Sequence, residues 1–278
     1  MDVFRNRVAV ITGGASGIGA ALARAFAARG AKIVLADIDP EGLREMEREL
    51  ARAGTPVLSV PTDVAQRASV RALAEATWQR FGAAHIVCNN AGIALLGEIA
   101  KAPHEDWEFT INVDFWGVVH GVEAFVPRLI EQHQGGHVVN TASMAGLVGM
   151  QWLGIYCAAK FAVVGLTEAL HRELKPHGIG ASVLCPMIVS TKIGENSQRL
   201  RPGAEHSRSA AAAVPPGSAM RGGTVTAESV AEKVVRGIER QDLYILTHPE
   251  QREILRRRAA RIDAVFESWD RDDRERAV

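Results

Sequence analysis

The chain has 278 residues, of which 47% are apolar and 23% charged. This composition is typical of a folded globular protein and excludes a disordered or collagen-like chain. Lysine and arginine number 32, as do aspartate and glutamate, so the formal net charge of zero disfavours sequence-independent nucleic-acid binding. The sequence has no apolar run of about 18 residues and no N-terminal secretory pattern. We therefore expect a cytoplasmic protein without a membrane span.

Short apolar segments rich in Val, Ile and Leu recur along the chain and predict buried strands. They span residues 8–11, 33–36, 57–60, 86–89, 137–141, 181–185 and 243–246. Segments with helical periodicity lie between them; one carries Leu43, Met46 and Leu50 on a single stripe. Repeated strand–helix–strand order predicts a parallel sheet with helices on both sides.

The first predicted strand runs into a glycine loop, TGGASGIG at 12–19. Gly13 permits a tight turn, Gly17 a close approach of ligand to backbone, and Gly19 close packing of the following helix on the strand. The helix start offers free N–H groups and a positive dipole end to a pyrophosphate. Placed between a strand and a helix, this loop predicts a dinucleotide site rather than a simple turn.

Acidic and small residues follow the next strands. Asp37 ends the second strand, where a carboxylate accepts hydrogen bonds from an adenosine ribose and repels a 2′-phosphate, which favours NAD over NADP. Asp37 can instead cap the turn after it. Asp63 can bond the adenine amino group or cap a helix. The run NNAG at 89–92 lets the chain pass beneath a nucleotide.

Ser143 follows the fifth predicted strand, and Tyr156 and Lys160 lie four apart on one helix face. A neighbouring ammonium lowers the pKa of a tyrosine, which makes Tyr156 a candidate acid/base. The alternative is a tyrosine–lysine pair on a helix surface without a catalytic role. Ser143 can hold a substrate oxygen. Asn112 can support a relay of protons from the lysine through a carbonyl and a water.

These motifs together resemble the short-chain dehydrogenases/reductases, with TGGASGIG, Asp37, NNAG, Ser143 and YCAAK as the matching pieces. The resemblance implies a single three-layer Rossmann-like α/β domain, with one parallel seven-stranded sheet flanked by helices, and hydride transfer between an alcohol carbon and the nicotinamide. It implies Tyr156 as acid/base, with Lys160, Ser143 and Asn112 as its catalytic partners. The residues expected to bind the cofactor are Gly13, Ser16, Gly17, Ile18, Gly19, Asp37, Ile38, Asp63, Val64, Asn90, Ala91, Gly92, Tyr156, Lys160, Pro186, Val189 and Thr191. The family also implies a homo-oligomer, often a tetramer, through helices at about 104–130 and 154–175.

One departure from the family pattern is Met187 after Pro186, where many members have glycine. Its flexible side chain would narrow the pocket beside the nicotinamide. Apolar residues near Ser143 and Tyr156 suggest a hydrophobic substrate, although ordinary core packing explains each of them about as well. The candidate pocket residues are Leu95, Leu96, Met144, Leu147, Met150, Trp152, Met187 and Ile188.

Two stretches break the strand–helix pattern. We expect residues 1–249 to form the catalytic domain, in which an irregular segment at about 192–225 acts as a substrate lid. Arg199, Arg201 and Arg208 in that segment leave an anionic substrate open. Residues 250–278 predict an amphipathic helix and a charged tail that frays in solvent. The three cysteines predict reduced thiols, and the nine histidines form no set with metal-ligand spacing.

We therefore expect an NAD-dependent oxidoreductase that interconverts a secondary alcohol and its ketone, with a hydrophobic or aryl-bearing substrate. An NADP-linked carbonyl or 3-oxoacyl reductase is the alternative within catalysis. A non-catalytic protein that senses dinucleotides is the alternative outside it.

Overall fold

The computed structural model describes residues 3–202 and 222–276. Its centre is one all-parallel sheet with the strand order β3-β2-β1-β4-β5-β6-β7. The strands are β1 (Val8–Thr12), β2 (Lys32–Asp37), β3 (Val57–Pro61), β4 (Ile86–Asn89), β5 (Gly136–Thr141), β6 (Ile179–Cys185) and β7 (Tyr244–Leu246). Each of the seven predicted strands is confirmed to within two residues at either end, and so is the three-layer Rossmann-like fold.

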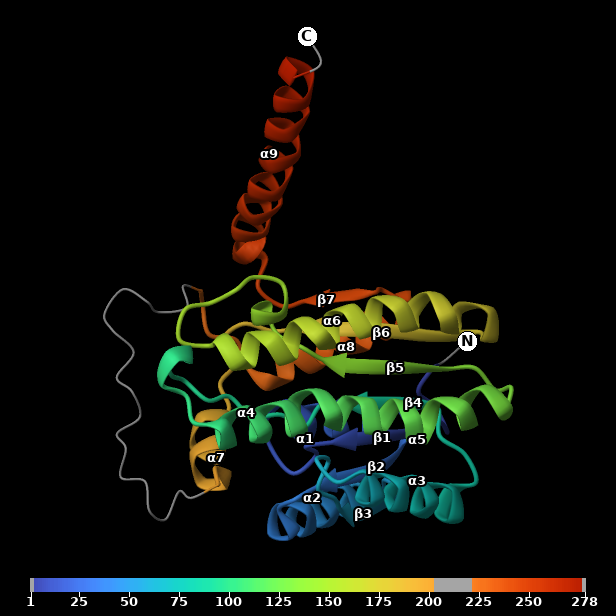
Figure 1. Cartoon of the computed structure of the whole chain (residues 1–278). Helices are drawn as coiled ribbons and strands as arrows, with labels where there is room; N and C mark the ends of the chain where they lie inside the picture. The colour runs from blue at the N-terminus through green and yellow to red at the C-terminus, as the bar shows by residue number, and fades with distance from the viewer. Residues whose placement is uncertain (1–2, 203–221, 277–278) are drawn as a thin grey trace.

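Helices cover both faces of the sheet (Figure 1). One face carries α1 (Gly17–Ala27), α2 (Pro40–Arg52) and α8 (Ala227–Arg240). The other carries α3 (Arg67–Phe81), α5 (Gly117–Glu131) and α6 (Gly154–Leu174), with α4 (His104–Ile111) leading into α5. The alternation along β1 divides the core: Ala9 and Ile11 pack under α1 and α8, whereas Val8 and Val10 pack under α3 and α5. The strands are apolar on both faces because both faces are covered.

Two helices lie outside these layers. The short α7 (Ile193–Leu200) follows β6, and α9 (Arg252–Arg276) leads away from the sheet at the C-terminal end (Figure 1). Most of the predicted lid, residues 203–221, lies outside the described residues. The predicted tail helix is present and continues as helix to Arg276 rather than ending near residue 270.

The strand order reverses between β1 and β4, and this fixes where a ligand can bind. The connections from β1 and β4 leave in opposite directions, which opens a crevice beyond the carboxyl ends of the two strands. The glycine loop follows β1, and Asn90 to Gly92 follow β4. All three cysteines are free thiols and are buried. No helix in the described part of the chain is long and apolar enough to cross a membrane.

Candidate active site

A cleft of about 780 Å³ opens at the carboxyl ends of the strands. Its walls come from the glycine loop, the ends of β2, β4, β5 and β6, and helices α4, α6 and α7. The structure brings all four predicted catalytic residues and nearly all predicted cofactor residues to this cleft. The exception is Gly19, which lies beneath the glycine loop.

The glycine loop has a shape that side chains would block. Gly17 has a φ of +51°, and a Cβ there would lie 3.1 Å from Cγ2 of Thr191 across the cleft. A Cβ on Gly19 would lie 2.0 Å from the carbonyl oxygen of Gly13, so α1 could not approach the loop as it does. Ser16, just before α1, makes no capping hydrogen bond with its side chain. The first N–H groups of α1 therefore remain available to an anion.

Asp37 closes the adenosine end of the cleft. Its two carboxylate oxygens accept hydrogen bonds from the backbone N–H groups of Ala15 and Asp39, each at 3.0 Å. Burial raises the pKa of Asp37, and these hydrogen bonds oppose the rise. Both predicted roles of Asp37 are compatible with this geometry, because it shapes the turn and also lines the cleft. Asp63 lines the same end and accepts a hydrogen bond from Ala65 N–H at 2.9 Å.

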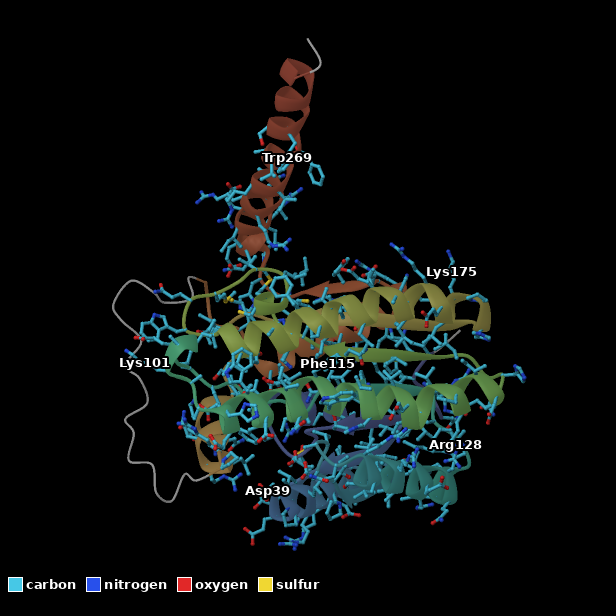
Figure 2. All side chains as sticks on the ribbon, viewed as in Figure 1. Asp39, Lys101, Phe115, Arg128, Lys175 and Trp269 are labelled. Carbon is cyan, nitrogen blue, oxygen red and sulfur yellow. The ribbon has the colours of Figure 1, made fainter. Side chains whose placement is uncertain are left out.

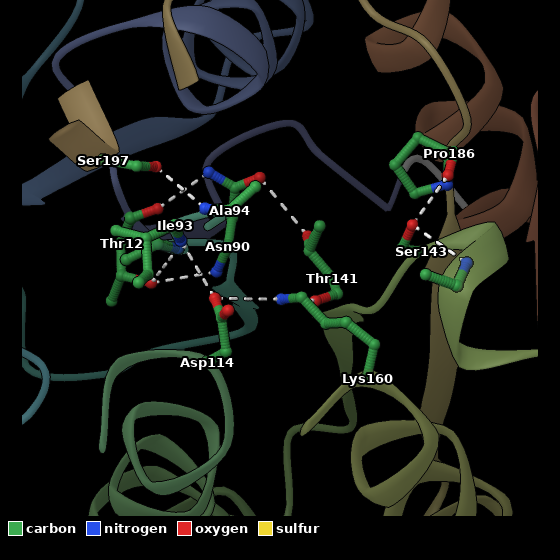
Figure 3. A network of polar contacts seen from close by, with 12 residues as sticks. Thr12, Asn90, Ile93, Ala94, Asp114, Thr141, Ser143, Lys160, Pro186 and Ser197 are labelled. Atoms are coloured by element: carbon green, nitrogen blue, oxygen red, sulfur yellow. Dashed lines mark hydrogen bonds and ion pairs between the residues drawn. The ribbon is translucent and has the colours of Figure 1, made fainter. Parts of the chain in front are cut away.

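The floor of the cleft is held by Asn90 and Thr12 (Figure 3). The Oγ1 atom of Thr12 accepts hydrogen bonds from the N–H groups of Asn90, at 2.9 Å, and of Ala91, at 3.0 Å. The amide nitrogen of Asn90 donates to the Thr12 carbonyl at 3.0 Å, and Thr141 Oγ1 donates to Asn90 Oδ1 at 3.3 Å. Asn90 thus joins β1, β4 and β5 beneath the cleft that it lines.

Ser143, Tyr156 and Lys160 meet where β5 and α6 approach each other. Ser143 Oγ donates to the carbonyl oxygen of Pro186 at 3.3 Å. Lys160 Nζ lies 5.5 Å from the centroid of the Tyr156 ring and donates to the Thr141 carbonyl at 3.0 Å. Tyr156 is half-buried, and the Ser143 hydroxyl lies close enough to lower the pKa of its phenol. A hydroxyl, a phenol and an ammonium therefore gather at one point of the cleft.

Sequence reasoning missed Asp114, which is fully buried against Lys160 (Figure 3). Its Oδ1 atom lies 3.3 Å from Lys160 Nζ and accepts a hydrogen bond from Ile93 N–H at 3.0 Å. Its Oδ2 atom has no hydrogen-bond partner among the described residues. Gly92 makes room for this pair, because a Cβ there would lie 2.8 Å from Asp114 Oδ1. Lys160 is thus paired with a carboxylate that neither spacing nor periodicity indicated.

Asn112 lies at the cleft, and its predicted relay through a backbone carbonyl and a water stays a prediction. It begins a π-helical turn, Asn112–Trp116, between α4 and α5, and its side chain is exposed and lines the cleft. No hydrogen bond joins it to Lys160 in the described part of the chain. Residues two positions apart on a helix lie on nearly opposite sides. The turn therefore directs the Asp114 side chain into the interior and the Asn112 side chain towards the exposed side.

The pKa of Tyr156 moves against the sequence expectation. Burial raises it, the charge of Asp114 raises it further, and the hydrogen bond with Ser143 only partly opposes these effects. The net shift is upward, opposite to the predicted lowering, and burial is its largest cause. Burial also raises the pKa of Asp114, with Lys160 opposing it.

Helix α7 covers the substrate end of the cleft and is fastened at two places. Ser197 Oγ accepts a hydrogen bond from Ala94 N–H at 2.8 Å. Just beyond the helix, Arg201 makes two contacts of 2.7 Å with the two carboxylate oxygens of Asp106 on α4. These contacts hold the described start of the predicted lid against the loop after β4 and against α4.

The lining of the substrate end differs from the predicted set. Leu96 and Met187 line the cleft as expected. The cleft lining does not include Leu95, Met144, Leu147, Met150, Trp152 or Ile188. Leu95, in the loop after β4, is buried in the protein interior. Met144 is also buried and Met150 packs beside Cys157, because the chain after β5 folds back onto α6. The side chains that replace them come from α4, α6 and α7 and were not predicted. They are Glu105, Glu108, Phe109, Leu153, Ile193, Asn196 and Leu200.

A family model described as short chain dehydrogenase matches residues 7–201. The chain is 43% identical over 199 residues to "Putative oxidoreductase SadH" of Mycobacterium tuberculosis, with 71% of this chain and 72% of the relative covered. It is 35% identical to "C alpha-dehydrogenase" of a Sphingobium strain, with 95% and 88% covered. The solved structure of a short chain dehydrogenase/reductase from Burkholderia phymatum in complex with NAD is 39% identical, with a TM-score of 0.86 and coverage of 95% and 96%.

Proposed function

Since the chain belongs to the short-chain dehydrogenase/reductase family, we propose that it is an NAD-dependent enzyme that interconverts a secondary alcohol and its ketone. As a member of this family it is an oxidoreductase that acts on CH–OH groups. The observation that carries the proposal is the meeting of Ser143, Tyr156 and Lys160 in the cleft that begins at the glycine loop.

We propose a separate role for each group of residues in the cleft. The N–H groups at the start of α1 bind the pyrophosphate, Asp37 binds the adenosine ribose, and Val189 and Thr191 flank the nicotinamide. When bound, the dinucleotide supplies the site that takes or gives the hydride. Ser143 Oγ and the Tyr156 phenol hold the substrate oxygen. In oxidation Tyr156 takes the hydroxyl proton, and in reduction it returns that proton to the ketone oxygen.

A hydrophobic or aryl-bearing substrate fits this proposal best. Phe109, Leu153 and Met187 present apolar surface beside the reacting groups, and Ile193 and Leu200 do so from α7. Charged side chains also line the cleft: Glu105 and Glu108 on α4, and Arg199 on α7. An apolar substrate therefore meets apolar side chains next to Tyr156, while any polar end can lie towards these charges.

The test of the chemistry compares the two tyrosines of the chain. We expect Tyr156→Phe to lower turnover by about 10²- to 10⁴-fold without changing the dissociation constant of NAD, because only proton transfer is removed. Turnover is followed by NADH fluorescence on a panel of secondary alcohols from aliphatic to aryl. Tyr244→Phe is the matched control, since Tyr244 lies on β7 and outside the cleft lining. Undiminished turnover in Tyr156→Phe contradicts the proposed acid/base, and NAD binding without turnover of any alcohol by the unaltered chain favours the sensing alternative.

The cofactor preference is tested at Asp37. We expect Asp37→Asn to lose about tenfold, or ~1.4 kcal/mol, of its preference for NAD over NADP, because the negative charge that repels a 2′-phosphate is removed while the side-chain shape is kept. Titration with both dinucleotides, followed by fluorescence, gives the two dissociation constants. An unaltered chain that binds NADP more tightly than NAD points instead to the NADP-linked reductase.

We also propose a homo-oligomer formed through α4, α5 and α6. Trp116, at the end of the π-helical turn, is 45% exposed and stacks on His120 of α5, which supports an aromatic contact surface on this side. Sedimentation velocity of the unaltered chain and of Trp116→Ala tests this surface, and we expect a smaller assembly for the variant.

A further inference from the structure

The C-terminal helix α9 (Arg252–Arg276) projects from the body of the protein (Figure 1). It is fixed near its start, where the guanidinium of Arg258 lies 5.4 Å from the ring centroid of Phe161 on α6. Farther along, Figure 2 shows Trp269 standing out from α9 beyond the sheet and its covering helices. An isolated helix of this kind gains most of its stability from packing an apolar face on another surface.

The apolar face of α9 is a seam that Arg258 interrupts between Leu255 and Ile262. Leu255, Ile262 and Trp269 are seven residues apart, and Val265 lies between the last two in the spacing of a coiled coil. Phe266 widens the seam. These side chains are exposed: Ile262 by 45%, Val265 by 53%, Phe266 by 68% and Trp269 by 64%. Four large apolar side chains on one face of one helix are far more than the scattered exposed residues of an ordinary surface.

Charge divides α9 into two halves of opposite sign. Residues 252–262 carry five arginines and one glutamate, whereas residues 263–269 carry two acidic residues and no basic one. Two such helices side by side in parallel would set arginines against arginines. Side by side in antiparallel they set each basic half against an acidic half, and their dipoles also oppose each other favourably.

We propose that α9 pairs antiparallel with α9 of a second copy of this chain, along the seam of Leu255, Ile262, Val265, Phe266 and Trp269. A second copy of α9 fits this seam, because a two-fold axis between two antiparallel copies sets the basic half of each helix against the acidic half of the other. A membrane surface fits less well, since the acidic half would face anionic lipid headgroups. None of these α9 residues lines the cleft.

Cross-linking with a short bismaleimide tests both the contact and its direction. We expect Ile262→Cys, near the middle of the helix, to form a covalent dimer. Leu255→Cys remains uncross-linked, because in the antiparallel pair the two copies of position 255 lie more than about 20 Å apart along the axis. Ala260→Cys, on the opposite side of the helix, is the matched control and also remains monomeric on a denaturing gel. The three native cysteines are buried, which keeps the background low.

Each other outcome overturns the proposal. Cross-linking of both Ile262→Cys and Leu255→Cys indicates a parallel pair, and cross-linking of neither indicates that α9 does not pair. Cross-linking of Ala260→Cys alone places the contact on the other face.

Sedimentation velocity of the full chain gives a second, independent measure. We expect Ile262→Glu to halve the mass of the assembly or to weaken its association at least tenfold, whereas Ala260→Glu, which adds the same charge on the other face, leaves it unchanged. Circular dichroism checks that both variants keep their helix content. Equal masses for both variants and the unaltered chain contradict the pairing, as does binding of α9 to vesicles of anionic lipid in preference to self-association.

Discussion

The carboxyl group of Asp114 is buried against the ammonium of Lys160, and within residues 3–202 and 222–276 only one of its two oxygens has a hydrogen-bond partner. A buried ion pair of this kind contributes little to stability by itself, because both charges lose their hydration. Its effect on the reaction is larger. Burial raises the pKa of Tyr156, and the nearby negative charge of Asp114 raises it further.

This arrangement predicts a pH dependence. In oxidation the phenolate of Tyr156 is the base, so the rate rises with pH until the phenol has titrated. Because burial and Asp114 raise that pKa, we expect the rate of alcohol oxidation to keep rising into the alkaline range. Ketone reduction uses the protonated phenol, so its rate falls over the same range. Both limbs are measured as kcat/KM against pH.

Asp114→Asn tests the carboxylate directly. Removing its charge lowers the pKa of Tyr156, so we expect the oxidation limb to move to lower pH and activity near pH 7 to increase. The bond from Lys160 to the Thr141 carbonyl keeps the lysine in place. Asn112→Ala is the control and leaves the pH profile where it is. A limb that moves with Asn112→Ala and not with Asp114→Asn would support the relay that the resemblance assigns to Asn112 over the effect of the Asp114 charge.

At the scale of elements, the π-helical turn between α4 and α5 decides which side chains enter the site. The sequence predicts one long helix over residues 104–130, and the structure has helix through this whole range. A single wider turn changes the direction in which the neighbouring side chains point. The apolar periodicity of the helix is too coarse to reveal this, so Asn112 and Asp114 could not be distinguished before the structure was known.

Helix α7 is held over the substrate end by the pair of Arg201 with Asp106. We expect Arg201→Ala to raise the KM for the alcohol several-fold and to leave the unfolding temperature nearly unchanged, because the pair fastens one short helix and lies at the edge of the fold. A double-mutant cycle with Asp106→Ala measures the coupling free energy between the two side chains, for which we expect about 1–2 kcal/mol. Additive effects of the two substitutions on KM would show that the pair does not act as a unit.

At the scale of the whole molecule, cofactor binding and folding are linked. The cleft is built from the ends of four strands and from loops far apart in sequence, so it exists only in the folded chain. A ligand at about 100 times its dissociation constant stabilises the fold by ~2.7 kcal/mol. We expect NAD at that excess to raise the unfolding temperature by several degrees and NADP at equal concentration to raise it less, measured by differential scanning fluorimetry. An equal rise with both contradicts the preference assigned to Asp37.

The fold follows from local features of the sequence. Each strand is a short run rich in Val, Ile and Leu, and the segments between strands have a helical period, so a parallel sheet with helices on both faces could be predicted. The strand order came from the structure. The glycine loop, Asp37 and the residues after β4 were likewise predictable as lining of the cleft, because the carboxyl ends of parallel strands meet at one edge. Ser143, Tyr156 and Lys160 follow from β5 and the spacing on α6.

The sequence by itself determined the family, the sheet and the residues that line the dinucleotide cleft, because each depends on spacing within one segment. Only the tertiary structure decided which side chain meets Lys160, which apolar residues face the substrate and which way the pKa of Tyr156 moves. Those outcomes depend on contacts between segments distant in the chain: Asp114 with Lys160, α7 with α4, and the loop after β5 with α6. Burial and the field of a buried charge arise from such contacts, and no local pattern records them.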